Sequence, residues 1–247
     1  MIVMNYRLEI CAFNVASALA AQQAGADRIE FCAGPQEGGT TPSAGEIRTA
    51  RENLRIALYP IIRPRGGDFL YSDEEFRSMI RDIEYCKQVG CNGVVLGILQ
   101  ADGTVDKGRC ARLVEVAYPL GVTFHRAFDW CANPFEAMET IIGIGCERIL
   151  TSGQRPTAYE GIALIDQLVR GADDRIVIMP GSGVRAGNIV ELAEKTGASE
   201  FHTSARALKA SAMEYVNAAM KESQDSVIAD PDEIMKIKEQ LAALEGA

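Results

Sequence analysis

The chain contains 247 residues, of which 47% are hydrophobic, 24% charged and 6% aromatic, a balance typical of a single α/β domain with a large core. Its formal net charge of -9, without a cluster of Lys and Arg, disfavours nucleic acid and anionic membrane surfaces as partners. The beginning MIVMNYRLEI lacks an export-signal pattern and the seven Cys follow no disulfide spacing, so we expect a cytoplasmic protein with reduced thiols.

Eight short apolar runs predict β-strands, and an amphipathic stretch that predicts a helix follows each of them. The predicted strands lie near residues 6–11, 28–32, 56–63, 93–99, 121–127, 148–152, 175–180 and 199–204. Capping patterns predict where helices begin: Ser43 with Glu46, Ser72 with Glu75, Thr157 with Glu160, Asn133 before Pro134, and Asp230 before Pro231. Glycines predict where helices end, at Gly25, Gly90, Gly121, Gly145 and Gly197.

The end of a helix, a Gly, a short turn and a new strand recur in AGADRIEF, VGCNGVVL, IGCERIL and TGASEFH. Repeated βα units form either a closed barrel or an open, doubly wound sheet. Polar residues follow the strands all along the chain, which favours a TIM (β/α)8 barrel as one domain over residues 1–247. The segment 205–230 fits no βα unit, and the sequence leaves a lid, a subunit contact and a disordered excursion open.

Alternation along the strands predicts which side chains face the barrel interior. If Leu8 and Ile10 face the helices, Glu9 and Cys11 point inward, and the same argument applies to the other strands. The predicted polar mouth gathers Glu9, Cys11, Glu30, Cys32, Arg63, His125, His202 and Ser204. Each Glu taken singly fits a structural ion pair equally well, and each Cys fits simple packing, so the convergence of the set carries the prediction.

Two loops of this mouth predict anion binding. Arg63 and Arg65 follow the third strand in a flexible RPRGGDF segment, and guanidinium groups suit carboxylates and phosphates. After the seventh strand, Gly181, Ser182 and Gly183 are expected to open directly into a helix that begins near Val184. The predicted anion-binding set is completed by Ser152, His202 and Ser204, and the glycine-rich run 34–43 is expected to form a flap beside it.

The runs ADRIEFCAGPQEGGTTPS, IIRPRGGDFLYS, VTFHRAFD, RILTSG, VIMPGSGV and SEFHTSAR resemble the CutC family over about residues 7–208. This resemblance implies a TIM-type barrel, a cytoplasmic protein, a homodimer or higher homo-oligomer, and a role in copper homeostasis. The proposed Cu(I) ligands of the family match Cys11 and Cys32, and thiolates suit this soft ion.

An enzyme is the alternative, because guanidinium groups repel a metal cation and attract anions. In this hypothesis Arg63 and the Gly181–Gly183 backbone hold a small anionic metabolite, for example a phosphorylated one. Glu9, Glu30 and His125 are then the candidate catalytic residues for acid/base chemistry. A small anion and Cu(I) are the two ligand classes that the sequence predicts, and they do not exclude each other.

Overall fold

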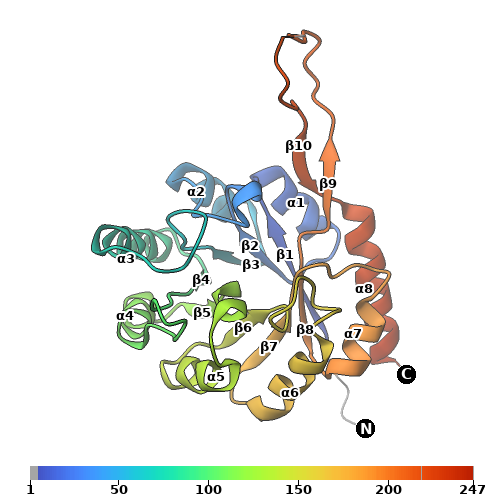
Figure 1. The fold of residues 1–247 in the computed structure, drawn as a ribbon. Coiled ribbons are helices and arrows are strands. Elements are labelled where there is room, and N and C mark those ends of the chain that lie inside the picture. Colours follow the sequence, from blue (N-terminus) through green and yellow to red (C-terminus); the bar gives the residue numbers. More distant parts are fainter. Residues whose placement is uncertain (1–4, 218, 247) are drawn as a thin grey trace.

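The computed structural model describes residues 5–217 and 219–246 and confirms the predicted TIM barrel, with parallel strands inside and helices outside (Figure 1). All eight predicted strands are present, most of them shorter than expected. They are β1 (Arg7–Ala12), β2 (Arg28–Phe31), β3 (Ala57–Pro60), β4 (Gly93–Leu96), β5 (Gly121–Phe124), β6 (Arg148–Thr151), β7 (Val177–Pro180) and β8 (Glu200–Thr203).

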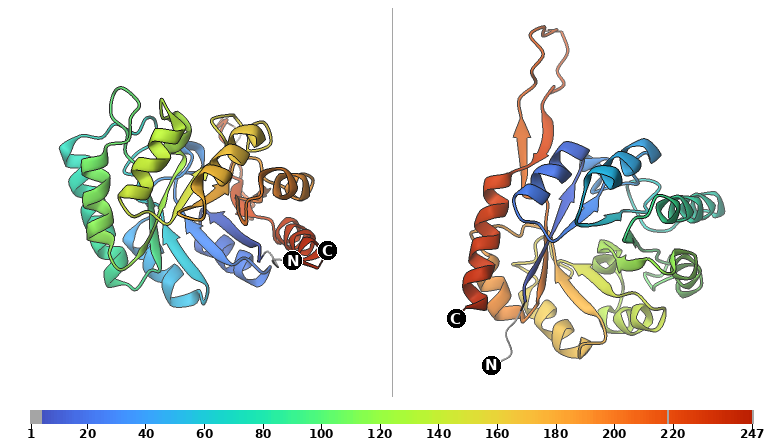
Figure 2. Two further views of the ribbon diagram at one scale, coloured as in Figure 1. Left: turned by 90° about the horizontal axis from the view of Figure 1, so that it is seen from below. Right: turned by 180° about the vertical axis from the view of Figure 1, so that it is seen from behind.

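Hydrogen bonds join the strands in the orders β3-β2-β1-β8 and β4-β5-β6-β7. A parallel bridge between Ile61 and Val95 links the two groups on one side, and β7 packs beside β8 on the other. The strands therefore enclose a common interior, which the views from below and behind also show (Figure 2). Across β1, Glu9 lies opposite His202 of β8 and Cys11 lies opposite Glu30 of β2, so this register brings the polar residues of three strands together.

The helices cover the outside of the barrel, and several begin where the sequence predicts. Ser43 and Ser72 form complete capping boxes, and the side chains of Asn133 and Asp230 accept hydrogen bonds from the first turns that follow them. The α-helices are α1 (Val15–Gln23), α2 (Ala44–Asn53), α3 (Asp73–Gln88), α4 (Lys107–Ala117), α5 (Pro134–Gly143), α6 (Ile162–Ala172), α7 (Ile189–Thr196) and α8 (Pro231–Glu245), and the short 3-10 helices are η1 (Pro35–Glu37) and η2 (Arg126–Trp130). None of the helices in the described ranges combines the length and apolar character needed to cross a bilayer.

Three predicted helix boundaries are wrong. Thr157 and Glu160 do exchange hydrogen bonds, but they form a turn, and α6 begins only at Ile162. Gly161 crosses the Ser152 carbonyl so closely that a Cβ would lie 2.0 Å from its oxygen, so the chain bends here before the helix begins. Gly121 is the first residue of β5, because α4 ends at Ala117 ahead of Pro119, which cannot donate a helical hydrogen bond.

The third wrong boundary is that of α7, which begins at Ile189 rather than near Val184. Ser182 and Gly183 have φ angles of +78° and +71°, which right-handed helices do not contain. The Asn188 side chain donates to the Gly183 carbonyl and accepts from the Arg185 N–H, which closes a loop in place of the first helical turn.

The alternation predicted for the strands is confirmed by two separate clusters of buried side chains. Leu8, Ile10 and Phe201 belong to the large core between strands and helices. Cys11 and Cys32 instead belong to a small cluster inside the barrel with Tyr59, Ile61 and Val95. All seven Cys are free and buried.

The segment 205–230 contains an antiparallel hairpin of β9 (Arg206–Lys209) and β10 (Ser226–Ala229), which projects from the barrel (Figure 1). Asn14 and Ser17 of the α1 region hold its base by hydrogen bonds to Val227 and Ala229. Beyond the strands, the apolar side chains of Met213, Tyr215 and Val216 are exposed. The homo-oligomer stays a prediction.

At the amino-terminal ends of the strands, on the side of the interior cluster away from the mouth, a buried ion-pair network spans the barrel. Arg28 pairs with Glu9 and, at 2.6 Å, with Glu200, and Arg148 donates to Glu200 at 2.7 Å. All four residues are at least 90% buried, so their charges are compensated mainly by one another. The network holds one carboxylate oxygen of Glu9 through Arg28, and the other oxygen points toward the mouth, where it contacts His202.

We expect Arg28→Met to lower the free energy of unfolding by about 3–5 kcal/mol, because it leaves buried carboxylates without their shared cation. Urea denaturation followed by circular dichroism measures this loss. Arg112→Met is the matched control, since the exposed Arg112–Glu115 pair should contribute less than about 1 kcal/mol. A loss for Arg28→Met as small as that of the control would contradict the structural role of the network.

Candidate functional site

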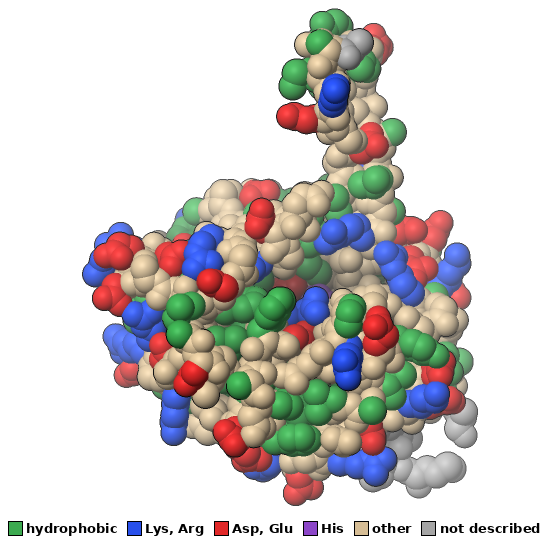
Figure 3. Space-filling view, viewed as in Figure 1, with side chains coloured by type: hydrophobic (Ala, Val, Ile, Leu, Met, Phe, Trp, Pro, Cys, Tyr) green, Lys and Arg blue, Asp and Glu red, His purple; other side chains and the backbone are tan. Residues whose placement is uncertain are grey.

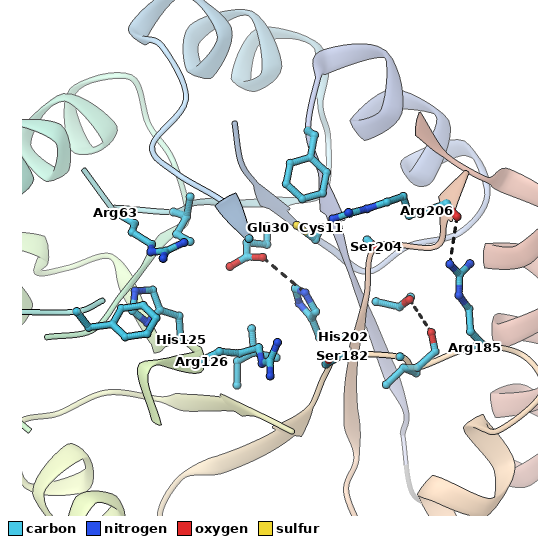
Figure 4. Close-up of a pocket in the computed structure, with 18 residues that line it drawn as sticks. Cys11, Glu30, Arg63, His125, Arg126, Ser182, Arg185, His202, Ser204 and Arg206 are labelled. Atoms are coloured by element: carbon cyan, nitrogen blue, oxygen red, sulfur yellow. Dashed lines mark hydrogen bonds and ion pairs between the residues drawn. The ribbon is translucent and has the colours of Figure 1, made fainter. Parts of the chain in front are cut away.

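A cavity of about 250 Å³ opens where the strands of the barrel end. In the space-filling view, basic side chains border a hollow near the middle of this face (Figure 3). The charged and titratable residues that line the cavity are Cys11, Glu30, Arg63, His125, Arg126, Arg185, His202 and Arg206, so four Arg accompany a single Glu (Figure 4).

His202 lies at the centre of this cavity between two carboxylates. Its Nδ1 is 2.7 Å from Oε1 of Glu9, and its Nε2 is 3.6 Å from Oε2 of Glu30. Burial opposes ionisation, but hydrogen bonds to Cys11 and Glu9 and the nearby carboxylates raise the pKa of His202 well above its usual value. Burial also opposes ionisation of Glu9, but Arg28 and His202 outweigh it and lower the pKa of the Glu9 carboxyl. Glu9 does not line the cavity, so it acts here by holding the imidazole.

Cys11 and Cys32 form a thiol pair beside His202. Their sulfurs lie 3.5 Å apart, and with a Glu30 oxygen they form a set of ligand atoms within 4.8 Å of one another. The hydrogen bond with Cys32 and the neighbouring His202 together overcome burial and lower the pKa of Cys11 to about 6. The pKa of Cys32 is raised well above its usual value by burial and by the Cys11 thiolate, and that of Glu30 is raised by the same two causes.

His125 follows β5 and lines the opposite side of the cavity. Its Nδ1 accepts a hydrogen bond of 3.2 Å from the Ala127 N–H, so the neutral ring carries its proton on Nε2. This Nε2 is buried and has no partner in the described part of the chain. Burial and the charge of Arg63 lower the pKa of His125 to about 3, so the imidazole is a neutral hydrogen-bond donor at physiological pH.

Arg63 organises the loops at the rim. Its guanidinium donates to the carbonyls of Glu37 (2.6 Å), Gly39 (2.9 Å) and Gly67 (2.8 Å), which ties the 34–43 run to the loop after β3. Its Nε is buried without a partner among the described residues. Arg63 therefore faces the cavity and also holds the predicted flap.

The structure brings most of the predicted anion-binding residues together. Ser182, Gly183, His202 and Ser204 line the cavity, and Gly181 packs directly against His202. Two residues lie elsewhere. Arg65 pairs with Glu75 and Asp68, and Ser152 is buried in hydrogen bonds with Asp129 and Arg126. Their partners are thus already within the protein, and neither lines the cavity.

The cavity residues that sequence reasoning missed include Phe13, Arg126, Arg185 and Arg206. Each of the three Arg lies at the end of a predicted strand or shortly after it, in HRAFD, GSGVR and TSAR. This position in the sequence could have predicted that the three Arg lie at the mouth, because the loops after the strands of a TIM barrel meet there.

Comparisons with known proteins agree with this architecture. The CutC family model matches residues 6–207. A CutC family protein of Parabacteroides distasonis is 54% identical over 215 residues, covering 87% of this chain and 88% of the relative. One of Chromobacterium violaceum is 54% identical over 212 residues, with 86% of each chain covered.

Among solved structures, CutC of Streptococcus agalactiae, a proposed copper homeostasis protein, superposes with a TM-score of 0.77 at 33% identity, covering 81% of this chain and 98% of that one. Phosphoribosyl anthranilate isomerase of Thermotoga maritima superposes with a TM-score of 0.59 at 16% identity, covering 96% and 99%, which shows the shared barrel fold alone. The family model and the curated relatives cover nearly the whole barrel, and the chain therefore belongs to the CutC family.

Proposed function

We propose that this CutC family protein binds Cu(I) through Cys11 and Cys32 and serves copper homeostasis in the cytoplasm. The observation that carries the proposal is the buried pair of sulfurs 3.5 Å apart, of which Cys11 lines the cavity and Cys32 lies behind it. Thiolates are the soft ligands that Cu(I) prefers. The role named for the Streptococcus agalactiae relative points in the same direction.

The surroundings of the pair fit a monovalent soft ion better than a divalent metal. Structural zinc sites use four tetrahedral ligands, whereas here two sulfurs and one carboxylate gather. The lowered pKa of Cys11 supplies a thiolate near neutral pH, and Cys32 can lose its proton when the ion binds. His202 and the four Arg add positive charge near the sulfurs, which favours a monovalent over a divalent metal ion.

A second candidate function is an enzyme that acts on a small anionic metabolite. The observation in its favour is the excess of cationic groups in the cavity, where Arg63, Arg126, Arg185 and Arg206 accompany Glu30 as the one acidic residue among the described lining residues. Burial and the Cys11 thiolate raise the pKa of Glu30, which favours a protonated acid beside the thiolate. An acid and a nucleophilic base at one barrel mouth suit proton transfer to and from a bound substrate.

We expect Cys11→Ser and Cys32→Ser each to weaken Cu(I) binding by at least about 100-fold, because hydroxyl groups are poor ligands for a soft ion. Competition with a chromogenic Cu(I) chelator under anaerobic conditions measures the affinity. Cys131→Ser is the control, because Cys131 is also buried but lies outside the site and should leave the affinity unchanged. Retention of wild-type affinity by both site variants would refute the proposal.

The ionisation of Cys11 gives a prediction of its own. Alkylation of Cys11 by iodoacetamide, followed by mass spectrometry, should rise with pH through a midpoint near 6, because only the thiolate reacts. In Cys32→Ala the midpoint should move upward, since the hydrogen bond that stabilises the thiolate is lost. Cys131, whose pKa burial raises to about 11, is an internal control that stays unreactive below pH 8. A wild-type midpoint above 8 would contradict the assignment.

For the second candidate, a ligand from a panel of phosphorylated and carboxylated metabolites should raise the melting temperature by several degrees at about 100 times its Kd. Arg126→Gln should reduce this shift, because the half-exposed guanidinium lines the cavity. Arg112→Gln, on the outer face of α4, should keep it. Differential scanning fluorimetry decides the point, and the absence of any shift across the panel would argue against an anionic substrate.

A further inference from the structure

The cavity has two polar ends on opposite sides of the central Cys11, Glu30 and His202 group. Figure 4 shows His125, Arg63 and Arg126 on one side, and Ser182, Ser204, Arg185 and Arg206 on the other. The two ends differ in the donors that they present, so they select different chemical groups.

Around Ser182, the loop after β7 presents a cluster of unused donors. Ser182, Gly183 and Val184 line the cavity, and within the described residues their backbone N–H groups donate to no acceptor. The left-handed φ angles of Ser182 and Gly183 give this loop the kind of backbone that can turn successive N–H groups to one side. Ser204, on the adjacent loop, also lines the cavity and adds a hydroxyl group to this end.

Two guanidinium groups complete this end. Arg185 uses one nitrogen to donate to the Arg206 carbonyl at 3.1 Å, and the Arg206 guanidinium stacks on the Phe13 ring at 5.0 Å. These contacts position both side chains, and most of their N–H groups meet no acceptor within residues 5–217 and 219–246. Several backbone N–H donors, a hydroxyl and two guanidinium groups match the three oxygens and the double charge of a phosphate monoester.

Besides the half-exposed Arg126, the end near His125 presents two deeply buried donor side chains. His125 is 97% buried and Arg63 is 94% buried, and the Nε2 of the first and the Nε of the second both lack a partner among the described residues. An unpaired buried donor is costly, so these two atoms are expected to meet an acceptor on a ligand. A neutral imidazole N–H beside a guanidinium suits one carboxylate, which can accept from both.

We propose that the cavity binds a compact two-ended metabolite, with a phosphate monoester at Ser182–Val184 and Ser204 and a carboxylate at His125 and Arg63. The carbon atoms between the two groups then lie over Cys11, Glu30 and His202. This inference rests on the second candidate function and specifies its substrate class, and it is independent of Cu(I) binding by the thiol pair.

Isothermal titration calorimetry with inorganic phosphate, glycolate and 2-phosphoglycolate tests the proposal. We expect 2-phosphoglycolate to bind at least about tenfold more tightly than either single-ended probe, because one molecule then engages both ends. Ser204→Ala should weaken phosphate and 2-phosphoglycolate while sparing glycolate. Arg185→Ala is a second variant of the same end, and Arg112→Ala is the remote control.

A matched pair of variants tests the end at His125. The His125→Asn side chain retains an acceptor near the Nδ1 position for the Ala127 N–H but lacks the Nε2 donor, so it should weaken 2-phosphoglycolate and spare phosphate. The longer His125→Gln amide restores a donor near Nε2 and should recover part of the affinity. Circular dichroism verifies that each variant is folded.

Equal affinities for phosphate and 2-phosphoglycolate would overturn the two-ended arrangement, and so would an effect of His125→Asn on phosphate as large as that on 2-phosphoglycolate. If neither phosphate compound binds while another anion of the metabolite panel stabilises the protein, the assignment of the ends is wrong and the anion-binding function survives. If no anion binds at all, the two-ended substrate and the anion-binding function are both refuted. The Cu(I) affinity of Ser204→Ala should equal that of the wild type, so the copper proposal is tested independently of both outcomes.

Discussion

The hydrogen bond between Glu9 and His202 is the interaction on which the rest of the site depends. Glu9 accepts from Arg28 below and from His202 above, so one buried carboxylate joins the ion-pair network of the barrel to the cavity. It fixes the imidazole ring and keeps it charged, and the charged ring in turn favours the Cys11 thiolate. A change in the ion-pair network would therefore alter the ionisation of the Cys11 thiol, because electrostatic interactions between neighbouring groups are strong where little water is present.

The cavity combines two kinds of chemistry. Its floor carries a thiol pair suited to a soft cation, and its walls carry guanidinium groups suited to anions. The two are compatible because Cu(I) adds only one positive charge, which a single thiolate already neutralises. The overall negative charge of the protein does not contradict an anionic ligand, since the Arg side chains set the field locally where the strands end.

Predictions from the sequence were accurate where a short-range rule applies. Period-two alternation places Glu9 and Cys11 inside the barrel because neighbouring side chains on a strand must point to opposite faces. The start of α7 was wrong because the left-handed backbone at Ser182 and the side-chain contacts of Asn188 close a loop there. Arg65 was predicted at the mouth by its place in the chain, yet its pairing with Glu75 holds it outside the cavity.

By itself, the sequence determined the barrel, the family and most of the inward-pointing polar side chains of the strands, because strand periodicity, capping residues and long motifs are local properties of the chain. Only the tertiary structure decided which of those side chains touch. The register of β1 between β2 and β8 pairs Cys11 with Glu30 and Glu9 with His202, and the same closure leaves the Nε2 of His125 without a partner among the residues that the structure describes. Charges, pKa values and unpaired donors follow from these contacts, since electrostatic energies depend on distance and burial rather than on order in the chain.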